Sequence, residues 1–473
     1  MLVVDGYVAV IGYSYGKGGT EIIRFRLGAD GRLAFHDAYR LAASDYYSEE
    51  NYASRLIGNE LVTYNVRHMY DRTEPDQLLP ALTDETPGRP GRTQILARAG
   101  EVFIDPNAAA SNLAYDSLHS ITRCDLTAPS LRCSATAAIG PSSRTFYVSP
   151  RAIYLWTTAL SGEEGRAPAT VYRLPLAGGR PQALRVSGAP LDQFSFREDP
   201  ERARLDVVVQ SDWGGDAMWS RSRREGSVAL LSLPLDRFGD GSRGATRSDY
   251  RELPGLETGG WQRENRFIGP WLLYAVGNGE DHDGEYDKAR GGTLLATRVD
   301  RNEDRTFRLP SPASRIEAMG EDALIVSQGP AGLTMTALEL DTRARIGATY
   351  PVPGTGEAEG RSHGFFFRPD ARRGSTGMFG LPILQRKGRT DGLEMLFLRR
   401  EAGGFSSLGG LASTERGGDD HCRSSCMDWY GQSRPIFLRG RIFALMGYEL
   451  VEGRVTDGRI REIARVNFMP RVA

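Results

Sequence analysis

The chain has 473 residues, with 59 Lys and Arg against 60 Asp and Glu, so its formal net charge is −1. This balance argues against a nucleic-acid partner, because proteins that hold phosphates without sequence preference carry a basic excess. The length exceeds that of one ordinary hydrophobic core, so the chain must hold several domains or one domain extended by repetition.

Glycine and proline are spread along the whole chain, with 56 and 25 residues. This distribution is typical of many tight turns between short strands. No apolar run approaches the 18 residues that a membrane-spanning helix needs, so we expect no membrane span.

A pair of short apolar segments recurs along the chain, bounded by Gly, Pro or Asp turns. The first members are Tyr7–Ile11, Leu61–Val66, Ile153–Trp156, Leu205–Val209, Trp271–Val276, Ala323–Val326, Met378–Ile383 and Ile442–Met446. Their partners are Glu21–Leu27, Ile121–Leu126, Val171–Leu176, Val228–Leu235, Leu294–Val299, Met335–Leu340 and Leu393–Leu398. Eight units result, the last with a less obvious partner. Radial repetition of small sheets explains this rhythm, so we predict an all-β fold, a single β-propeller of seven or eight blades over residues 1–473. A β-helix or a pair of β-sandwiches stays open as an alternative.

Four segments resemble landmarks of one protein family. They are Tyr52–Gly58, Phe146–Trp156, Asp192–Glu198 and Ser362–Phe367, in family order across almost the full chain. The chain thus resembles the secreted prokaryotic proteins with a C-terminal β-propeller domain, an uncharacterised β-propeller family. The resemblance implies a propeller without an assigned biochemical role. An equivalent of the Gly-Val-Asp-Glu-Ala-Asp stretch that usually opens this domain is missing, so we expect the first blade to lack part of its N-terminal side.

Four cysteines form two close pairs, Cys124 with Cys133 and Cys422 with Cys426. This spacing favours two local disulfides and hence an oxidising compartment, so we expect an extracytoplasmic protein, either periplasmic, cell-surface or secreted. For the second pair, two free thiols remain an alternative, as does a metal cluster that includes Asp419, Asp420 and His421.

A polar residue followed by arginine recurs where a strand opens a unit. Ser54-Arg55 and Asn265-Arg266 match in register, Ser314-Arg315 and Ser433-Arg434 are looser echoes, and Ser362-His363 takes the corresponding place in another unit. In propellers the strand that opens a blade lines the central channel. The predicted ligand-binding residues are therefore Arg55, Arg266, Arg315, His363 and Arg434, since guanidinium groups suit carboxylates and phosphates. The alternative is that each arginine pairs with a neighbouring carboxylate and fixes blade packing.

Acidic residues alternate around Gly284 in one loop. Asp281, Asp283, Glu285 and Asp287 offer the oxygen ligands that Ca²⁺ uses, which makes Ca²⁺ the one weakly indicated cofactor. The spacing departs from an EF-hand, because Gly292 stands where the twelfth-position carboxylate belongs. A solvated acidic loop is the alternative.

The segment Gly12-Tyr-Ser14-Tyr-Gly16 fits the G-x-S-x-G pattern of hydrolases. In those enzymes a helix follows the serine, whereas here the strand Glu21–Leu27 follows. We therefore predict a hairpin turn and nominate no catalytic residue.

The sequence favours a non-enzymatic binding or scaffolding module of the cell envelope, whose partner would be an envelope protein or polysaccharide. A fold by itself does not establish a function. The alternative is an envelope hydrolase or lyase that acts on an anionic saccharide or peptide, with His363 as acid or base. Whether the protein is an enzyme stays open.

Overall fold

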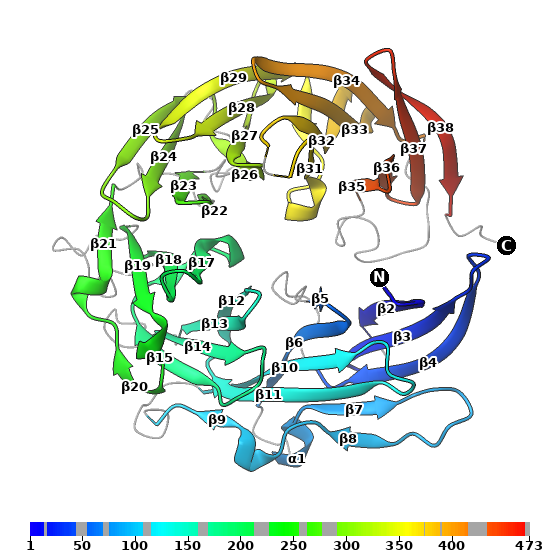
Figure 1. Ribbon diagram of the computed structural model, residues 1–473, viewed down its shortest axis with the longest axis vertical. Helices are drawn as coiled ribbons and strands as arrows, with labels where there is room; N and C mark the ends of the chain where they lie inside the picture. Colours follow the sequence, from blue (N-terminus) through cyan, green and yellow to red (C-terminus); the bar gives the residue numbers. More distant parts are fainter. Residues whose placement is uncertain are drawn as a thin grey trace. The chain divides into compact units, whose positions relative to one another are not determined.

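The structure is a computed structural model that describes residues 1–13, 17–43, 54–69, 75–106, 115–158, 169–211, 227–254, 263–276, 291–372, 374–387, 390–414 and 433–468. Within them the chain forms eight mainly antiparallel sheets. These sheets belong to two compact units, Met1–Leu253 and Pro254–Ala473, with four sheets each (Figure 1). The predicted all-β class is confirmed.

The first unit holds the first to fourth sheets. The first sheet has the order β1 (Leu2–Val4), β2 (Tyr7–Tyr13), β3 (Thr20–Leu27), β4 (Leu33–Leu41), β7 (Ala81–Asp84) and β8 (Thr93–Ile95). The second has β5 (Ser54–Ile57), β6 (Glu60–His68), β10 (Ser117–Asp125), β11 (Arg132–Gly140) and β9 (Phe103–Ile104). The third has β12 (Ser143–Val148), β13 (Ala152–Thr158), β14 (Ala169–Pro175), β15 (Gln182–Val186) and β20 (Asp240–Gly244). The fourth has β16 (Ala189–Pro190), β18 (Arg204–Gln210), β19 (Val228–Pro234) and β21 (Tyr250–Leu253), and β17 (Phe196–Asp199) also pairs with β18.

The second unit holds the fifth to eighth sheets. The fifth sheet is β22 (Arg263–Ile268), β23 (Trp271–Val276), β24 (Gly292–Arg298) and β25 (Asp304–Leu309). The sixth is β26 (Ala313–Met319), β27 (Asp322–Gly329), β28 (Gly332–Leu340) and β29 (Ala344–Pro353). The seventh is β30 (Thr355–Glu357), β32 (Gly377–Lys387), β33 (Thr390–Glu401) and β34 (Gly404–Ala412), and β31 (Phe366–Pro369) also pairs with β32. The eighth is β35 (Arg434–Leu438), β36 (Arg441–Met446), β37 (Glu449–Thr456) and β38 (Arg459–Asn467).

Helical segments in the described part of the chain are short. They are α1 (Pro75–Leu78) and the 3-10 turns η2 (Ala99–Glu101), η4 (Gln193–Ser195), η5 (Leu235–Arg237), η6 (Arg247–Asp249) and η7 (Ser362–Gly364). Among these residues no helix is both long and apolar enough to span a bilayer.

The predicted repeat is confirmed as eight sheets. All eight predicted first members lie in the second strand of a sheet, namely β2, β6, β13, β18, β23, β27, β32 and β36. The seven predicted partners lie in the third strands. The partner that the sequence left unclear is β37, whose apolar residues Leu450, Val451 and Val455 are interrupted by charged ones. Second and third strands stand out most where both of their faces are buried, as in β6, β13 and β27.

Strand β27 shows how this burial arises. Ala323 and Ile325 join the hydrophobic cluster with the fifth sheet, whereas Leu324 and Val326 join the cluster with the seventh. Because successive side chains of a strand point to opposite faces, a strand that is covered on both faces becomes a continuous apolar run. A fully buried Leu, Ile or Val side chain contributes roughly 1.5–3 kcal/mol when it leaves water. In each unit such clusters join consecutive sheets pairwise.

Tight turns join the strands within a sheet. Asp5-Gly6 connects β1 to β2 and Asp457-Gly458 connects β37 to β38, and all four residues have positive φ. This geometry matches the two-residue hairpin turns whose twist suits the flanking strands, for which Asp-Gly is a preferred pair.

Candidate functional site

The polar-arginine step has the register that the sequence predicted. Arg55 lies on β5 opposite Val62, and Arg266 lies on β22 opposite Leu273, so both occupy the same place on the first strand of their sheets. Arg315 and Arg434 also lie on first strands, β26 and β35. His363 lies in η7, between β30 and β31 of the seventh sheet.

In the second unit two of these positions, Arg266 and Arg315, belong to a charged network. Arg266 Nη2 donates to Glu317 Oε2 at 2.6 Å, which ties the fifth sheet to the sixth. Glu317 also accepts from Arg315 Nη1 at 2.9 Å on its own strand. Because Arg315 and Glu317 are two residues apart on β26, their side chains share one face. The Glu317 side chain is only 4% exposed, so this carboxylate depends on both arginines for compensation.

Arg315 carries the network into the seventh sheet. Its Nε donates to Glu357, its Nη2 to the carbonyl oxygens of Glu359 and Arg361, and its Nη1 also to that of Arg361. Each of its three nitrogens therefore has an acceptor, and the side chain is 4% exposed. A ligand-binding role for Arg315 stays a prediction that these contacts do not favour, because its donors are engaged within the protein.

Burial and charge act in opposite directions on this pair. Burial by itself would lower the pKa of Arg315, but the carboxylates of Glu357 and Glu317 outweigh it and raise the pKa above its usual value. Burial raises the pKa of Glu357, and Arg315 and the Ser314 hydroxyl, 3.1 Å from Glu357 Oε2, limit that rise. We therefore treat Arg266, Glu317, Arg315 and Glu357 as one neutral network across three consecutive sheets.

A second group of charges adjoins this network before β31. Glu359 accepts from Arg361 Nε at 2.8 Å, and His363 Nε2 lies 3.7 Å from Glu359 Oε2. Burial would raise the pKa of Glu359, but its contacts with His363 and Arg361 outweigh it and lower that pKa to about 2. The His363 side chain is 34% exposed, and its Nε2 is buried without a hydrogen bond to any residue that the structure describes. An ionised carboxylate thus lies beside an imidazole that still reaches solvent.

The two remaining predicted residues are exposed. Arg55 Nη1 donates to the carbonyl oxygen of Ser54 at 3.2 Å, and its Nη2 lies 3.5 Å from Gln193 Oε1. Arg434 is exposed on β35, and within the described ranges it forms no ion pair. Of the five predicted residues, the structure therefore links Arg266 and Arg315 through Glu317, places His363 beside Glu359 in the adjoining group, and leaves Arg55 and Arg434 apart from both.

The sequence prediction named no carboxylate of this network. Glu317, Glu357 and Glu359 were missed, although Arg315-x-Glu317 places two charges on one face of β26, and charges alternate in Glu357-x-Glu359-x-Arg361 from the end of β30 onward. Alternating charges on a strand usually indicate a solvated face, so only the packing of neighbouring sheets shows that these are buried.

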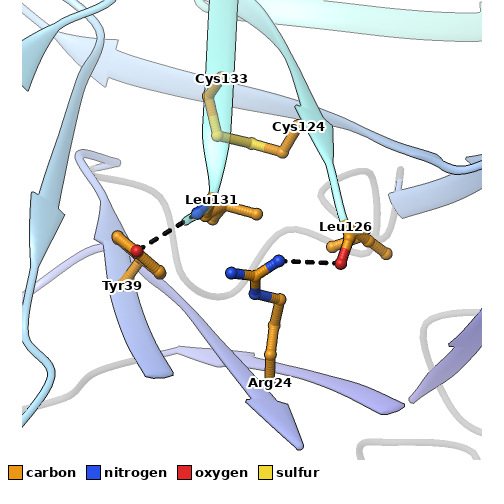
Figure 2. The surroundings of a disulfide bond; sticks show 6 residues. All are labelled: Arg24, Tyr39, Cys124, Leu126, Leu131 and Cys133. Carbon is orange, nitrogen blue, oxygen red and sulfur yellow. Dashed lines mark hydrogen bonds between the residues drawn. A yellow bond between two sulfur atoms is a disulfide. The ribbon is translucent and has the colours of Figure 1, made fainter. Parts of the chain in front are cut away.

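The sequence prediction also missed an arginine that is fully buried in the first unit. Arg24 on β3 binds Asp37 on β4 through Nε at 2.7 Å and Nη2 at 2.5 Å. Its Nη1 donates to the carbonyl oxygens of Leu126 and Ala128 at 2.8 and 2.7 Å, in the turn between β10 and β11. The predicted Cys124–Cys133 disulfide is confirmed at the base of this turn (Figure 2).

The second and third sheets also bury a histidine. His119 Nε2 lies 3.0 Å from the carbonyl oxygen of Pro141, and Nδ1 lies 2.7 Å from Tyr64 Oη. Since a carbonyl only accepts, Nε2 carries the proton and the Tyr64 hydroxyl donates to Nδ1. Burial, aided by the charge of Arg144, lowers the pKa of His119 from 6.5 to about 3.

This histidine should make the first unit sensitive to acid. Below pH 6.5 the unfolded state takes up a proton that folded His119 refuses until about pH 3, so stability should fall as the pH drops between these values. His119→Gln keeps one donor and one acceptor and should flatten this dependence. Urea unfolding at pH 7, 5.5 and 4.5 measures it, with His68→Gln as the control. If the free energy of unfolding falls equally with decreasing pH in wild type and His119→Gln, the prediction is contradicted.

Three predictions lie outside the described residues. These are the Ca²⁺ loop with Asp281, Asp283, Glu285 and Asp287, the Cys422 and Cys426 pair with its metal alternative, and Ser14 of the G-x-S-x-G segment. Within the part of the chain that the structure describes, no group of three or more His, Cys, Asp or Glu side chains could hold a metal ion.

Comparisons with known proteins give weak likenesses. No protein-family model and no curated protein matches the sequence. Among solved structures, the chain is similar to a candidate 6-phosphogluconolactonase from Bacteroides uniformis, at 10% identity and a TM-score of 0.36, covering 76% of this chain and 94% of that one. The chain is also similar to a Synechocystis apocarotenoid oxygenase mutant, at 10% identity and a TM-score of 0.31, covering 72% of this chain and 88% of that one.

An acylaminoacyl peptidase gives 11% identity and a TM-score of 0.34, with 86% of this chain and 51% of that one covered, so the chain spans about half of the peptidase. At these identities and TM-scores the likenesses do not bear on the function of this chain.

Proposed function

We propose that the eight sheets form a single β-propeller over residues 1–473, and that it acts as a rigid binding or scaffolding module of the cell envelope. The observation that carries this proposal is the network of Arg266, Glu317, Arg315 and Glu357, which ties three consecutive sheets. Charges placed on the first strands, where a ligand would be expected, are here used to join sheets. A frame held in this way suits the presentation of loops and exposed side chains to a partner.

The proposal includes an extracytoplasmic location and membership of the secreted prokaryotic family that the sequence resembles. The disulfide of Cys124 and Cys133 supports the location, because such bonds persist in oxidising compartments. The partner would be an envelope protein or polysaccharide with carboxylate or phosphate groups, since Arg55 and Arg434 are the exposed arginines among the predicted ligand-binding residues.

A second candidate function is hydrolysis of, or elimination from, an anionic saccharide or peptide. His363 favours it, because a partly exposed imidazole beside an ionised carboxylate is an arrangement that serves acid or base chemistry. Glu359, whose Oε2 lies 3.7 Å from His363 Nε2, would be the carboxylate beside the ring.

One experiment separates the two functions. The full chain is incubated with a pool of envelope-derived anionic saccharides and peptides in buffer with Ca²⁺, and both binding and the composition of the pool are measured by mass spectrometry. We expect saturable binding and an unchanged pool. Arg55→Ala or Arg434→Ala should weaken binding by roughly 10- to 150-fold, because a hydrogen bond to a charged group contributes roughly 1.5–3 kcal/mol.

Turnover would contradict the binding module. The second function holds if a component of the pool is consumed and His363→Gln abolishes this turnover without changing the melting temperature. His68→Gln, the control, should leave the turnover in place. Absence of saturable binding together with an unchanged pool would argue against both.

A further inference from the structure

We propose that the disulfide of Cys124 and Cys133 is a redox-sensitive latch that fixes the first sheet against the second. The latch consists of this bond, the turn of residues 126–131 that it closes, and the side chains of Arg24, His36 and Tyr39 that hold the turn. Figure 2 shows Arg24 and Tyr39 beside the turn and the disulfide.

The turn is bound to the first sheet at several points. Arg24 donates to the carbonyl oxygens of Leu126 and Ala128 and lies 3.5 Å from that of Pro129. The Tyr39 hydroxyl accepts from the Leu131 N–H at 3.2 Å. His36 Nε2 lies 3.0 Å from the Pro129 carbonyl oxygen, and since a carbonyl only accepts, this nitrogen donates. Side chains of the first sheet thus hold the backbone of the turn in place through hydrogen bonds.

The disulfide fixes that position. Cys124 on β10 is directly opposite Cys133 on β11, one pair before the strands end at Asp125 and Arg132. The bond therefore closes the ladder where it meets the turn. Cys124, Leu126 and Leu131 also pack in one hydrophobic cluster with Ile22 and Leu41 of the first sheet. A frayed end of this hairpin would move both the hydrogen-bonding carbonyls and the apolar contacts.

The burial of Arg24 and Asp37 on the first sheet makes the link between the turn and this sheet strong. Arg24 and Asp37 are both fully buried, so the guanidinium has no water to replace lost acceptors. If the turn withdraws, Asp37 alone satisfies Arg24, and the remaining N–H groups are left buried and unpaired, which is costly. The redox state of the cysteines is therefore linked to the contact between the two sheets.

The chemistry is thiol–disulfide exchange with an external dithiol. Its thiolate attacks Sγ of Cys133, the less buried of the two cysteines, and forms a mixed disulfide while Cys124 leaves as a thiolate. The second thiol of the reagent then displaces Cys133. The dithiol is oxidised to a disulfide, and the protein gains two thiols, so two electrons and two protons are transferred.

The test compares the oxidised full chain with the same protein treated with dithiothreitol. Hydrogen exchange, resolved by peptide, follows β3 and β4, and alkylation identifies which cysteines are reduced. We expect exchange in Thr20–Leu27 and Leu33–Leu41 to rise at least tenfold once Cys124 and Cys133 are alkylated, while β27 and β28 of the second unit are unchanged. The variant with Cys124→Ser and Cys133→Ser should show the faster exchange without dithiothreitol.

A matched control removes a different link between the same sheets. Asn59→Ala deletes an exposed hydrogen bond to Asp5, at 3.0 Å, and should change exchange in β3 and β4 less than twofold. Alkylation of both cysteines without faster exchange overturns the proposal, and so does a disulfide that dithiothreitol does not reduce in the folded protein. If the double variant fails to fold, the comparison of the oxidised and dithiothreitol-treated wild-type chain decides the question.

Discussion

Replacement of Arg24 by methionine is expected to lower the free energy of unfolding of the first unit by about 3–5 kcal/mol, the range for removing one partner of a buried ion pair. Arg24 and Asp37 both have 0% exposed side chains. The variant leaves the Asp37 carboxylate without its bidentate partner, and it leaves the carbonyl oxygens of Leu126 and Ala128 without their donor. Urea unfolding, monitored by hydrogen exchange in β3, measures the loss in the free energy of unfolding.

An exposed arginine on the same hairpin provides the control. Arg32 is 90% exposed and lies 3.5 Å from Asp30, so Arg32→Met should change the free energy of unfolding by less than about 1 kcal/mol. The double variant Arg24→Met, Asp37→Leu should recover part of the loss, because no buried charge then remains. If Arg24→Met costs no more than Arg32→Met, the turn is not held by this charge.

Arg315→Met should destabilise the second unit by a similar amount, about 3–5 kcal/mol. The variant leaves Glu357 buried with the Ser314 hydroxyl and leaves Glu317 with Arg266 alone. It also removes the donors to the carbonyl oxygens of Glu359 and Arg361. Arg315→Lys should rescue little, since an ammonium group lacks the planar fork that reaches these acceptors together.

The pH dependence of this loss identifies its cause. Burial already raises the pKa of Glu357, and without Arg315 that pKa should rise further. A carboxyl group whose folded pKa is raised adds stability below its unfolded pKa, near 4.5, and loses it as the pH rises through the folded value. The deficit of Arg315→Met should therefore shrink between pH 7 and pH 4.5. A deficit that is constant with pH would show that lost packing, and not an unpaired carboxylate, is responsible.

The control for this variant lies on the same sheet. Arg345 pairs with Glu339 at 2.6 Å but is 69% exposed, so Arg345→Met should cost less than about 1 kcal/mol. The contrast between the two variants tests whether burial, and not the presence of an ion pair, sets the cost.

The repeat could be predicted from sequence because it is written in uninterrupted apolar runs. Strand β27 is one such run, since the fifth and seventh sheets cover its two faces. Fourth strands such as β25 and β38 were less visible, because they alternate charged and apolar residues on a partly solvated surface. The disulfide of Cys124 and Cys133 was predictable because the two cysteines are nine positions apart and a hairpin brings them together.

The charged groups could be predicted only in part. Sequence matching placed Arg55 and Arg266 at the same position of their sheets, and the structure agrees. It gave no means to tell Arg55, which is exposed, from Arg315, which is buried. A charge at a given strand position has the same sequence signature whether the next sheet offers it a carboxylate or leaves it in water.

The sequence by itself thus determined the all-β class, the eight units and the local disulfide, because each depends on residues that are close together in the chain. The tertiary structure alone decided that Glu317 and Glu357 compensate the arginines of β22 and β26, and that Arg24 holds a turn more than 100 residues away. These pairings depend on which sheets become neighbours. The reason is physical: desolvation makes a buried charge costly until a specific partner from another segment meets it, and local sequence does not encode that partner.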